Sequence, residues 1–250
     1  MAEPRVRDGV LQLSAPGTTW LSTGWNGGRS RADAAYNCTV PEGWERTDLD
    51  RYIAERRSGA GFEREGPTLL TGVEMRNARC ARMTAERDGT GAIDVFAVAT
   101  AGVSNPAVLF PGAEPDSDAH RTSDLEDSPS ETGTVNLLVH VDQPATEGAL
   151  ANLVAVVAET KTATLLRETG FPGTTTDAVV VGATERSERT PDPLQFTGSG
   201  TPTGAAVRAC VRDALLAGLA ARYADGTMPD TVADAEHGVV ADGSPNVFRP

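Results

Sequence analysis

The sequence predicts an α/β or α+β fold in which a layered mixed sheet is flanked by helices in a single domain. In the C-terminal half, apolar segments of strand length alternate with longer segments whose apolar residues recur at helical spacing. Loops rich in glycine and threonine join these segments, which is typical of layered α/β domains. With 250 residues, of which 39% are hydrophobic, the chain is long enough for one large core built from Val, Leu and Ala.

In the N-terminal half, turn and capping residues mark the elements. Thr47 or Asp48 suits the N-cap of a helix and Gly59 suits its end, while three arginines at spacing three favour a second, polar-faced helix. The expected elements are short strands over 9–23, a turn at 25–28, a helix over 48–58, a strand over 68–73, a helix over 74–84 and a strand over 93–103.

The C-terminal half gives a clearer pattern. We expect a strand over 134–141, a helix over 146–167, a strand over 177–183 and a helix over 202–223. Alternation in the first strand puts Thr134, Asn136 and Leu138 on one face and apolar residues on the other.

The formal net charge of −13 argues against nucleic acid or an anionic membrane as a partner. Most of the excess acid lies in two stretches, and we expect a mobile acidic insertion at about 111–132 and an extended or frayed acidic tail at 224–250, outside a domain of residues 1–223. An acidic chain that uses arginine in place of lysine resembles proteins from high-salt cytoplasms.

Cys38, Cys80 and Cys210 are widely spaced and odd in number, so they predict neither a disulfide framework nor a zinc site. The first residues lack an apolar stretch, and no run of about 18 apolar residues follows. A cytoplasmic protein is therefore expected.

Lys161 is the only lysine among 22 basic residues. At about 100° per residue it lies on the apolar stripe of its helix, together with Leu150, Leu153, Val154, Val157 and Leu165. An inward-facing lysine without a partner has a lowered pKa and can exchange a proton near neutral pH. The alternative is that its long stem carries the amine out of the stripe to solvent.

Two loops, residues 170–177 and 196–204, offer glycine backbone N–H groups and hydroxyls that could hold a phosphate, a carboxylate or an oxyanion, although such loops are often plain connectors. Asn136, inside an apolar strand, needs a partner that is either a loop backbone or a ligand. Asp177 either fixes its own turn or holds a lysine or water. His140 lies on the Asn136 face and stays a candidate, whereas His120 and His237 are weaker ones.

Six short motifs occur in an order that resembles the adenosylcobinamide amidohydrolase family. They are residues 26–28 (Asn-Gly-Gly), 100–105 (Thr-Ala-Gly-Val-Ser-Asn), 133–136 (Gly-Thr-Val-Asn), 159–163 (Glu-Thr-Lys-Thr-Ala), 174–178 (Thr-Thr-Thr-Asp-Ala) and 198–201 (Gly-Ser-Gly-Thr). The resemblance spans about residues 9–222 and departs from the family pattern at Pro202-Thr203.

The resemblance implies hydrolysis of the amide that joins aminopropanol to the corrin ring of adenosylcobinamide, giving adenosylcobyric acid for cobamide (vitamin B12) salvage. Our hypothesis is that Lys161 transfers the proton and that Asp177 or Asn136 orients Lys161. In this hypothesis, the N–H groups of the Gly/Thr loops bind the oxyanion. In the alternative mechanism, Thr134 or Thr176 is the nucleophile. The residues expected to contact substrate are Trp25, Asn26, Gly27, Gly28, Ser104, Asn105, Thr176, Gly198, Ser199, Gly200 and Thr201.

The expected partner is a small-molecule corrinoid, which is the substrate, with no further cofactor or metal and with a homo-oligomer left open. One alternative is a corrinoid-binding protein without catalysis. Another is an enzyme that binds phosphate or nucleotide through the Gly/Thr loops, against which stand the negative charge and the lack of a phosphate-loop lysine. The last alternative is a self-processing hydrolase.

Overall fold

The structure is a computed structural model that describes residues 2–41, 44, 46–87, 91–109, 133–187, 191–229, 235, 238–241 and 245–249. The expected acidic insertion at 111–132, His120 and His237 lie outside these residues. In chain order, the elements are β1 (Glu3–Arg7), β2 (Val10–Ser22), β3 (Gly28–Thr39), α1 (Leu49–Gly59), β4 (Thr68–Thr71), η1 (Met75–Asn77), β5 (Arg79–Arg87), β6 (Gly91–Ala101), β7 (Ala107–Val108), β8 (Val135–Val141), α2 (Glu147–Thr169), β9 (Ala178–Thr184), α3 (Pro202–Arg222) and β10 (Val239–Val240).

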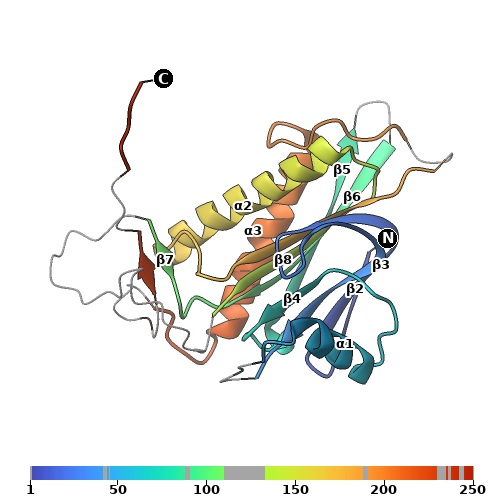
Figure 1. Ribbon diagram of the computed structural model, residues 1–250. Helices are drawn as coiled ribbons and strands as arrows, with labels where there is room; N and C mark the ends of the chain where they lie inside the picture. The colour runs from blue at the N-terminus through green and yellow to red at the C-terminus, as the bar shows by residue number, and fades with distance from the viewer. Residues whose placement is uncertain are drawn as a thin grey trace.

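Eight strands form one mixed sheet in the order β4-β3-β2-β9-β8-β6-β5, with β1 paired to β2 beside this path (Figure 1). The long strand β2 links two halves of the sheet, because its first half pairs with β1 and its second half pairs with β9. Between the halves the register with β3 shifts, and Gly17 there has a φ of +63°.

The two halves pack face to face. Leu11 and Leu13 of β2 share a buried cluster with Val98 of β6, Leu138 of β8 and Val180 of β9. The opposite face of β6, β8 and β9 packs against α2 and α3, while Tyr36 and its neighbours on the outer face of the other half lie under α1 and the segment that follows it. The result is the expected layered α/β domain, with α1, two sheet layers, and α2 with α3 in succession (Figure 1).

Capping residues mark both ends of α2 and the start of α3. The Thr146 hydroxyl accepts from the N–H of Ala149, Gly170 closes α2 with a φ of +77°, and Thr201 caps α3 ahead of Pro202. By length and composition α2 could cross a membrane, and half of its most apolar stretch is buried inside the protein. Since β8 and β9 are parallel neighbours, α2 runs back along the sheet from the end of β8 to the start of β9.

The helix predicted over 74–84 is wrong. The segment forms the short η1 turn and then strand β5, which pairs along its whole length with β6. Ala81 and Ala85, two positions of the same strand face, pack against the core under α3, so tertiary pairing outweighs the helical spacing of the arginines. Strands β1 and β3 were also not expected. Strand β1 is exposed along its whole length, and Arg29, Arg31 and Asp33 give the first half of β3 no apolar pattern.

Part of the acidic tail is ordered as β10, which pairs in parallel with β7. The backbone N–H of Val239 donates to the carbonyl of Pro106 at 3.0 Å, and that of Ala241 donates to Val108 at 2.9 Å. This small sheet continues toward the loop of Gly173, whose carbonyl accepts from the N–H of Ala107. The tail is thus extended here, and it lies beside the edge at which β9 begins.

His140 is a buried structural residue whose imidazole makes stability depend on pH. The Thr18 hydroxyl donates to the carbonyl of Ala15, so the Nε2 atom of His140, 3.2 Å from that hydroxyl oxygen, is the donor to it. Burial lowers the pKa of His140 from 6.5 to about 4, although the charge of Asp142 acts in the opposite direction. His140 lies four positions after Asn136 along β8, away from the start of the strand.

Because the unfolded chain takes up this proton more readily than the folded one, stability falls as the pH drops from about 6.5 toward 4. The loss reaches about 3 kcal/mol. Denaturant unfolding between pH 4.5 and 7 measures it, and His140→Gln, which cannot titrate, is expected to flatten the slope. An equal slope in the variant would assign the pH dependence to other groups.

Candidate functional site

Several candidate residues meet at the edge of the sheet where β8 and β9 begin. Thr134 directly precedes β8, and Asp177 directly precedes β9. Because β6 is antiparallel to β8, its continuation through Ser104 and Asn105 leaves the sheet at this edge too. The C-terminal half of α2, which carries Lys161, returns to it. Elements far apart in sequence therefore bring polar side chains together here.

Lys161 and Asp177 form an ion pair at the centre of this edge. Both side chains are nearly buried, with exposed fractions of 12% and 11%. The inward direction predicted from helical phase is confirmed, and Leu153, Val157 and Leu165 of the same stripe are buried in the core. The premise of an unpartnered amine is wrong, because the Asp177 carboxylate is its partner.

The Asp177 carboxylate is held by its neighbours. Its Oδ1 atom accepts from the backbone N–H of Val135 at 3.0 Å and from the hydroxyl of Thr174, and its Oδ2 atom accepts from the backbone N–H of Thr174 at 3.0 Å. With Lys161 on Oδ2 as well, both oxygens are engaged and the carboxylate has one orientation. Asp177 therefore fixes its own turn and also holds the lysine.

Gly173 lets the loop backbone touch the ion pair. A Cβ atom at this position would lie 2.5 Å from Oδ2 of Asp177 and 2.6 Å from Nζ of Lys161. The loop thus approaches more closely than any side chain would allow.

Hydroxyl and amide groups surround the pair. The hydroxyl oxygens of Thr134 and Thr176 lie 2.9 Å apart, and Thr176 is exposed whereas Thr134 is buried. The Ser104 hydroxyl accepts from the N–H of Gly133 at 2.8 Å, and the Asn105 side-chain amide donates to the hydroxyl of Thr175 at 2.6 Å. The structure therefore brings together Lys161, Asp177, Thr134, Thr176, Ser104 and Asn105.

Asn136 lies between the two sheet layers. Its amide nitrogen donates to Oδ1 of Asn37 at 3.0 Å and to the carbonyl of Leu70 at 2.9 Å, and Asn37 in turn donates to Thr100. Asp177, and not Asn136, is therefore the residue that contacts the amine of Lys161. Sequence reasoning missed Asn37, although a polar residue inside the apolar stretch 34–38 was a usable signal.

Two amide oxygens near this edge are buried without a hydrogen-bond partner in the described part of the chain. They are Oδ1 of Asn136 and Oδ1 of Asn105. A buried acceptor left unpaired costs about 1–3 kcal/mol, so such atoms need an explanation in a ligand or a water.

The turn at 25–28 contacts α1. The indole N–H of Trp25 and the side-chain amide of Asn26 both donate to Oδ1 of Asp50, at 2.9 and 2.7 Å. Asn26 has a φ of +47°, and a Cβ on Gly27 would lie 2.5 Å from a backbone carbonyl oxygen. These residues, with Gly28, line a pocket of about 450 Å³ between the turn and α1.

The second glycine loop lies away from Lys161. The hydroxyl of Thr197 donates to the carbonyl of Ala149 at 2.7 Å, which places the loop against the first turn of α2. Lys161 is twelve residues further along this helix, roughly 18 Å at 1.5 Å per residue. The structure therefore does not bring Gly198, Ser199, Gly200 and Thr201 to the ion pair.

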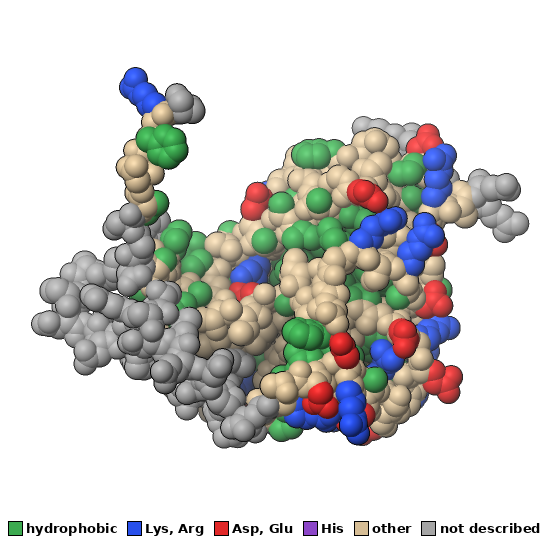
Figure 2. Space-filling model, viewed as in Figure 1, with side chains coloured by type: hydrophobic (Ala, Val, Ile, Leu, Met, Phe, Trp, Pro, Cys, Tyr) green, Lys and Arg blue, Asp and Glu red, His purple; other side chains and the backbone are tan. Residues whose placement is uncertain are grey.

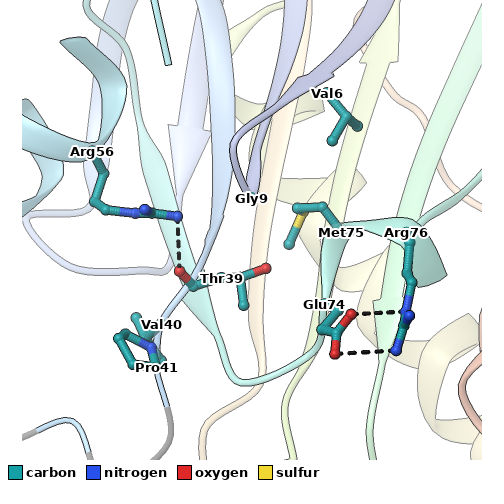
Figure 3. A pocket seen from close by; sticks show the side chains of 9 residues that line it. All are labelled: Val6, Gly9, Thr39, Val40, Pro41, Arg56, Glu74, Met75 and Arg76. Carbon is teal, nitrogen blue, oxygen red and sulfur yellow. Dashed lines mark hydrogen bonds and ion pairs between the residues drawn. The ribbon is translucent and has the colours of Figure 1, made fainter. Parts of the chain in front are cut away.

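Another hollow, of about 400 Å³, contains none of the residues expected from the sequence (Figure 3). Its charged side chains are engaged within the protein, since Arg56 donates to the carbonyl of Thr39 and Arg76 pairs with Glu74. Across the described residues, no group of three or more His, Cys, Asp or Glu side chains could hold a metal ion.

Two of the solved structures that resemble this chain are similar to it in extent. One is a protein from Pyrococcus horikoshii, 13% identical, with a TM-score of 0.45, covering 87% of this chain and 78% of that one. The other is an l-aminopeptidase d-ala-esterase/amidase from Ochrobactrum anthropi, described as a variant of the Ntn hydrolase fold. It is 12% identical, with a TM-score of 0.42, covering 88% and 82%.

Comparisons of sequence are more specific. An adenosylcobinamide amidohydrolase of Halobacterium salinarum is 47% identical over 252 residues, covering 100% of both chains. The adenosylcobinamide amidohydrolase of Methanosarcina mazei is 28% identical over 208 residues, covering 81% of this chain and 90% of its own. The adenosylcobinamide amidohydrolase family model matches residues 2–227. This protein therefore belongs to the adenosylcobinamide amidohydrolase family.

Proposed function

We propose that this protein hydrolyses the amide joining aminopropanol to the corrin ring of adenosylcobinamide, releasing adenosylcobyric acid and 1-aminopropan-2-ol. Family membership supports amide hydrolysis of adenosylcobinamide. The observation that supports this site most strongly is the Lys161–Asp177 ion pair. It lies at the edge of the sheet where β8 and β9 begin, close to hydroxyl and amide groups. The product re-enters cobamide synthesis in the cytoplasm.

In the proposed reaction, water attacks the amide carbon, the carbon–nitrogen bond breaks, and the departing amine takes up a proton. Lys161 gives that proton to the nitrogen and takes one from the attacking water, because its amine is the N–H donor at the centre of the cluster. Asp177 keeps the amine in place through its fixed carboxylate.

The oxyanion formed on the amide oxygen needs donors close to Lys161. The N–H groups of Gly170, Phe171, Thr174 and Thr175 already donate within the protein. In the 170–177 loop the backbone N–H groups of Gly173 and Thr176 and the exposed Thr176 hydroxyl therefore suit this role. The 196–204 loop suits it less, because it packs on the far end of α2.

The test is incubation of the purified protein with adenosylcobinamide, with and without a chelator, followed by mass spectrometry. We expect adenosylcobyric acid and aminopropanol under both conditions. Retention of intact adenosylcobinamide by the protein would instead favour a corrinoid-binding protein without catalysis.

Replacing Gly173 by alanine is expected to lower kcat about 100-fold with little change in KM. The added methyl group forces the ion pair and the loop apart, and misplacement by about 1 Å can cost this much. Steady-state kinetics measure the effect. Gly148→Ala is the matched control, since a Cβ there meets nothing within 4 Å. Equal kinetics for both variants would show that the close approach at Gly173 is irrelevant.

A Thr134 nucleophile is the alternative chemical route. If water attacks directly, Thr134→Val is expected to lose about 10-fold in kcat, through the missing hydroxyl contact with Thr176, and not the 10³-fold or more expected for a lost nucleophile. Intact-mass measurement during turnover is expected to show one chain of 26.1 kDa without an adduct. A covalent adduct, or a chain cleaved before Thr134, would establish the threonine route.

A further inference from the structure

The indole ring of Trp25 is a large aromatic surface that is fixed in position and partly exposed to solvent. The residue is 49% exposed, although its indole N–H is bound to Asp50 of α1. Asn26 donates to the same carboxylate oxygen, so the whole turn is anchored to the helix. An anchored indole that keeps an open face is a platform on which a flat ring can stack at little entropic cost.

The charges around this platform favour a neutral ligand over an anion. The three arginines of the pocket each have an acidic partner: Arg29 pairs with Glu147, Arg31 with Glu185 and Arg57 with Glu65. Figure 2 likewise shows basic and acidic side chains interspersed over the part of the surface that contains α1.

Asp50 differs from these groups. Among the described residues its carboxylate has only the neutral donors of Trp25 and Asn26, and it has no ion pair. We call the pocket between the turn at 25–28 and α1 the groove. A phosphate in this groove would face the negative charge of Asp50, whereas hydroxyl groups could donate hydrogen bonds to it. The combination of indole and carboxylate thus matches a nucleoside, whose base stacks and whose ribose donates.

The groove is close enough to the ion pair for one large substrate to reach both. Thr23 exchanges hydrogen bonds with Val179, which is two residues after Asp177, and Trp25 follows two residues after Thr23. From the reach of extended chain and the spacing of strands, Trp25 lies within about 20 Å of Asp177.

We propose that this groove is the subsite for the adenosyl group of the corrinoid, with the adenine stacked on Trp25 and the ribose hydroxyls donating to Asp50. The assignment rests on the proposed function for its substrate. It makes Trp25 a residue that selects adenosylated corrinoids, and it separates this role from cleavage at Lys161.

The direct test uses 5′-deoxyadenosine alone in a ligand-observed NMR titration, which requires no turnover. Wild type is expected to bind it saturably in the millimolar range, and Trp25→Ala to bind it at least about 10-fold more weakly, the size of a lost base–aromatic stack. Trp25→Phe, which keeps an aromatic face, is expected to restore most of the binding. Phe196→Ala is the matched control, because Phe196 is also an exposed aromatic, at 61%, but lies in the other loop.

Kinetics supply the second arm. Trp25→Ala is expected to raise KM for adenosylcobinamide about 10-fold, and clearly more than it raises KM for dicyanocobinamide, which lacks the adenosyl group. Equal affinity of wild type and Trp25→Ala for 5′-deoxyadenosine, or much tighter binding of adenosine monophosphate than of the nucleoside, would overturn the proposal. Nucleoside binding that depends on Trp25 without any cleavage of adenosylcobinamide would refute the amidohydrolase proposal separately.

Discussion

Replacing Lys161 by methionine is expected to lower kcat for adenosylcobinamide about 10³-fold in a protein that stays folded. Methionine keeps most of the apolar stem that packs along α2, but it removes the amine that faces Asp177. General acid–base groups contribute about 10²- to 10⁴-fold to rate, so the loss should appear in kcat. Steady-state kinetics and a thermal scan together measure it.

Two further variants show what the amine does. Lys161→Arg keeps the positive charge but cannot release a proton, so it is expected to remain at least about 100-fold impaired. Arg167→Met removes a charge from the exposed side of the same helix and is expected to act like wild type. Full activity in Lys161→Arg would reduce the role of the amine to holding charge, and full activity in Lys161→Met would remove it from the mechanism.

Replacing Asp177 by asparagine is expected to reduce both stability and activity. The carboxylate accepts from Val135, Thr174 and Lys161, and an amide NH₂ group would face at least one of these donors. Lys161 would also lose its counter-charge. We expect a loss of about 3 kcal/mol in the free energy of unfolding, and kcat lowered about 100-fold as the amine loses its position.

For a chain of this length, such a loss lowers Tm by roughly 10 °C. Asp142→Asn is the matched control, since Asp142 is exposed and, in the described part of the chain, its carboxylate accepts only from the Thr184 hydroxyl. A Tm change equal to that of the control would mean that the Asp177 contacts contribute nothing to stability.

The elements that could be predicted from the sequence are those in which local and global signals agree. In α2, the apolar stripe, the Thr146 cap and the glycine at 170 all give the same helix. In β5, arginines at helical spacing conflict with an alternating face that only the pairing with β6 reveals. Strand β3 was missed because its first half is polar and exposed, and only its neighbours in the sheet define it.

The site was predictable in part for the same reason. Helical phase gave the inward direction of Lys161, but its partner follows from β8 and β9 being parallel neighbours, which no local pattern contains. The roles of Asn37 and Asp50 depend on the sheet folding over on itself and on the position of α1. The position of Gly198 was open to inference, because a loop that follows β9 must leave the sheet at the edge opposite to Asp177.

In the proposed reaction, the amide of adenosylcobinamide is cleaved beside Lys161 and Asp177. A crystal structure of the Lys161→Met variant with adenosylcobinamide tests it most directly, because the variant is expected to bind substrate without cleaving it. We predict the aminopropanol amide within hydrogen-bonding reach of the 170–177 loop, next to residue 161. An amide bound instead at the 196–204 loop, at the other end of α2, would show that cleavage does not take place beside Lys161.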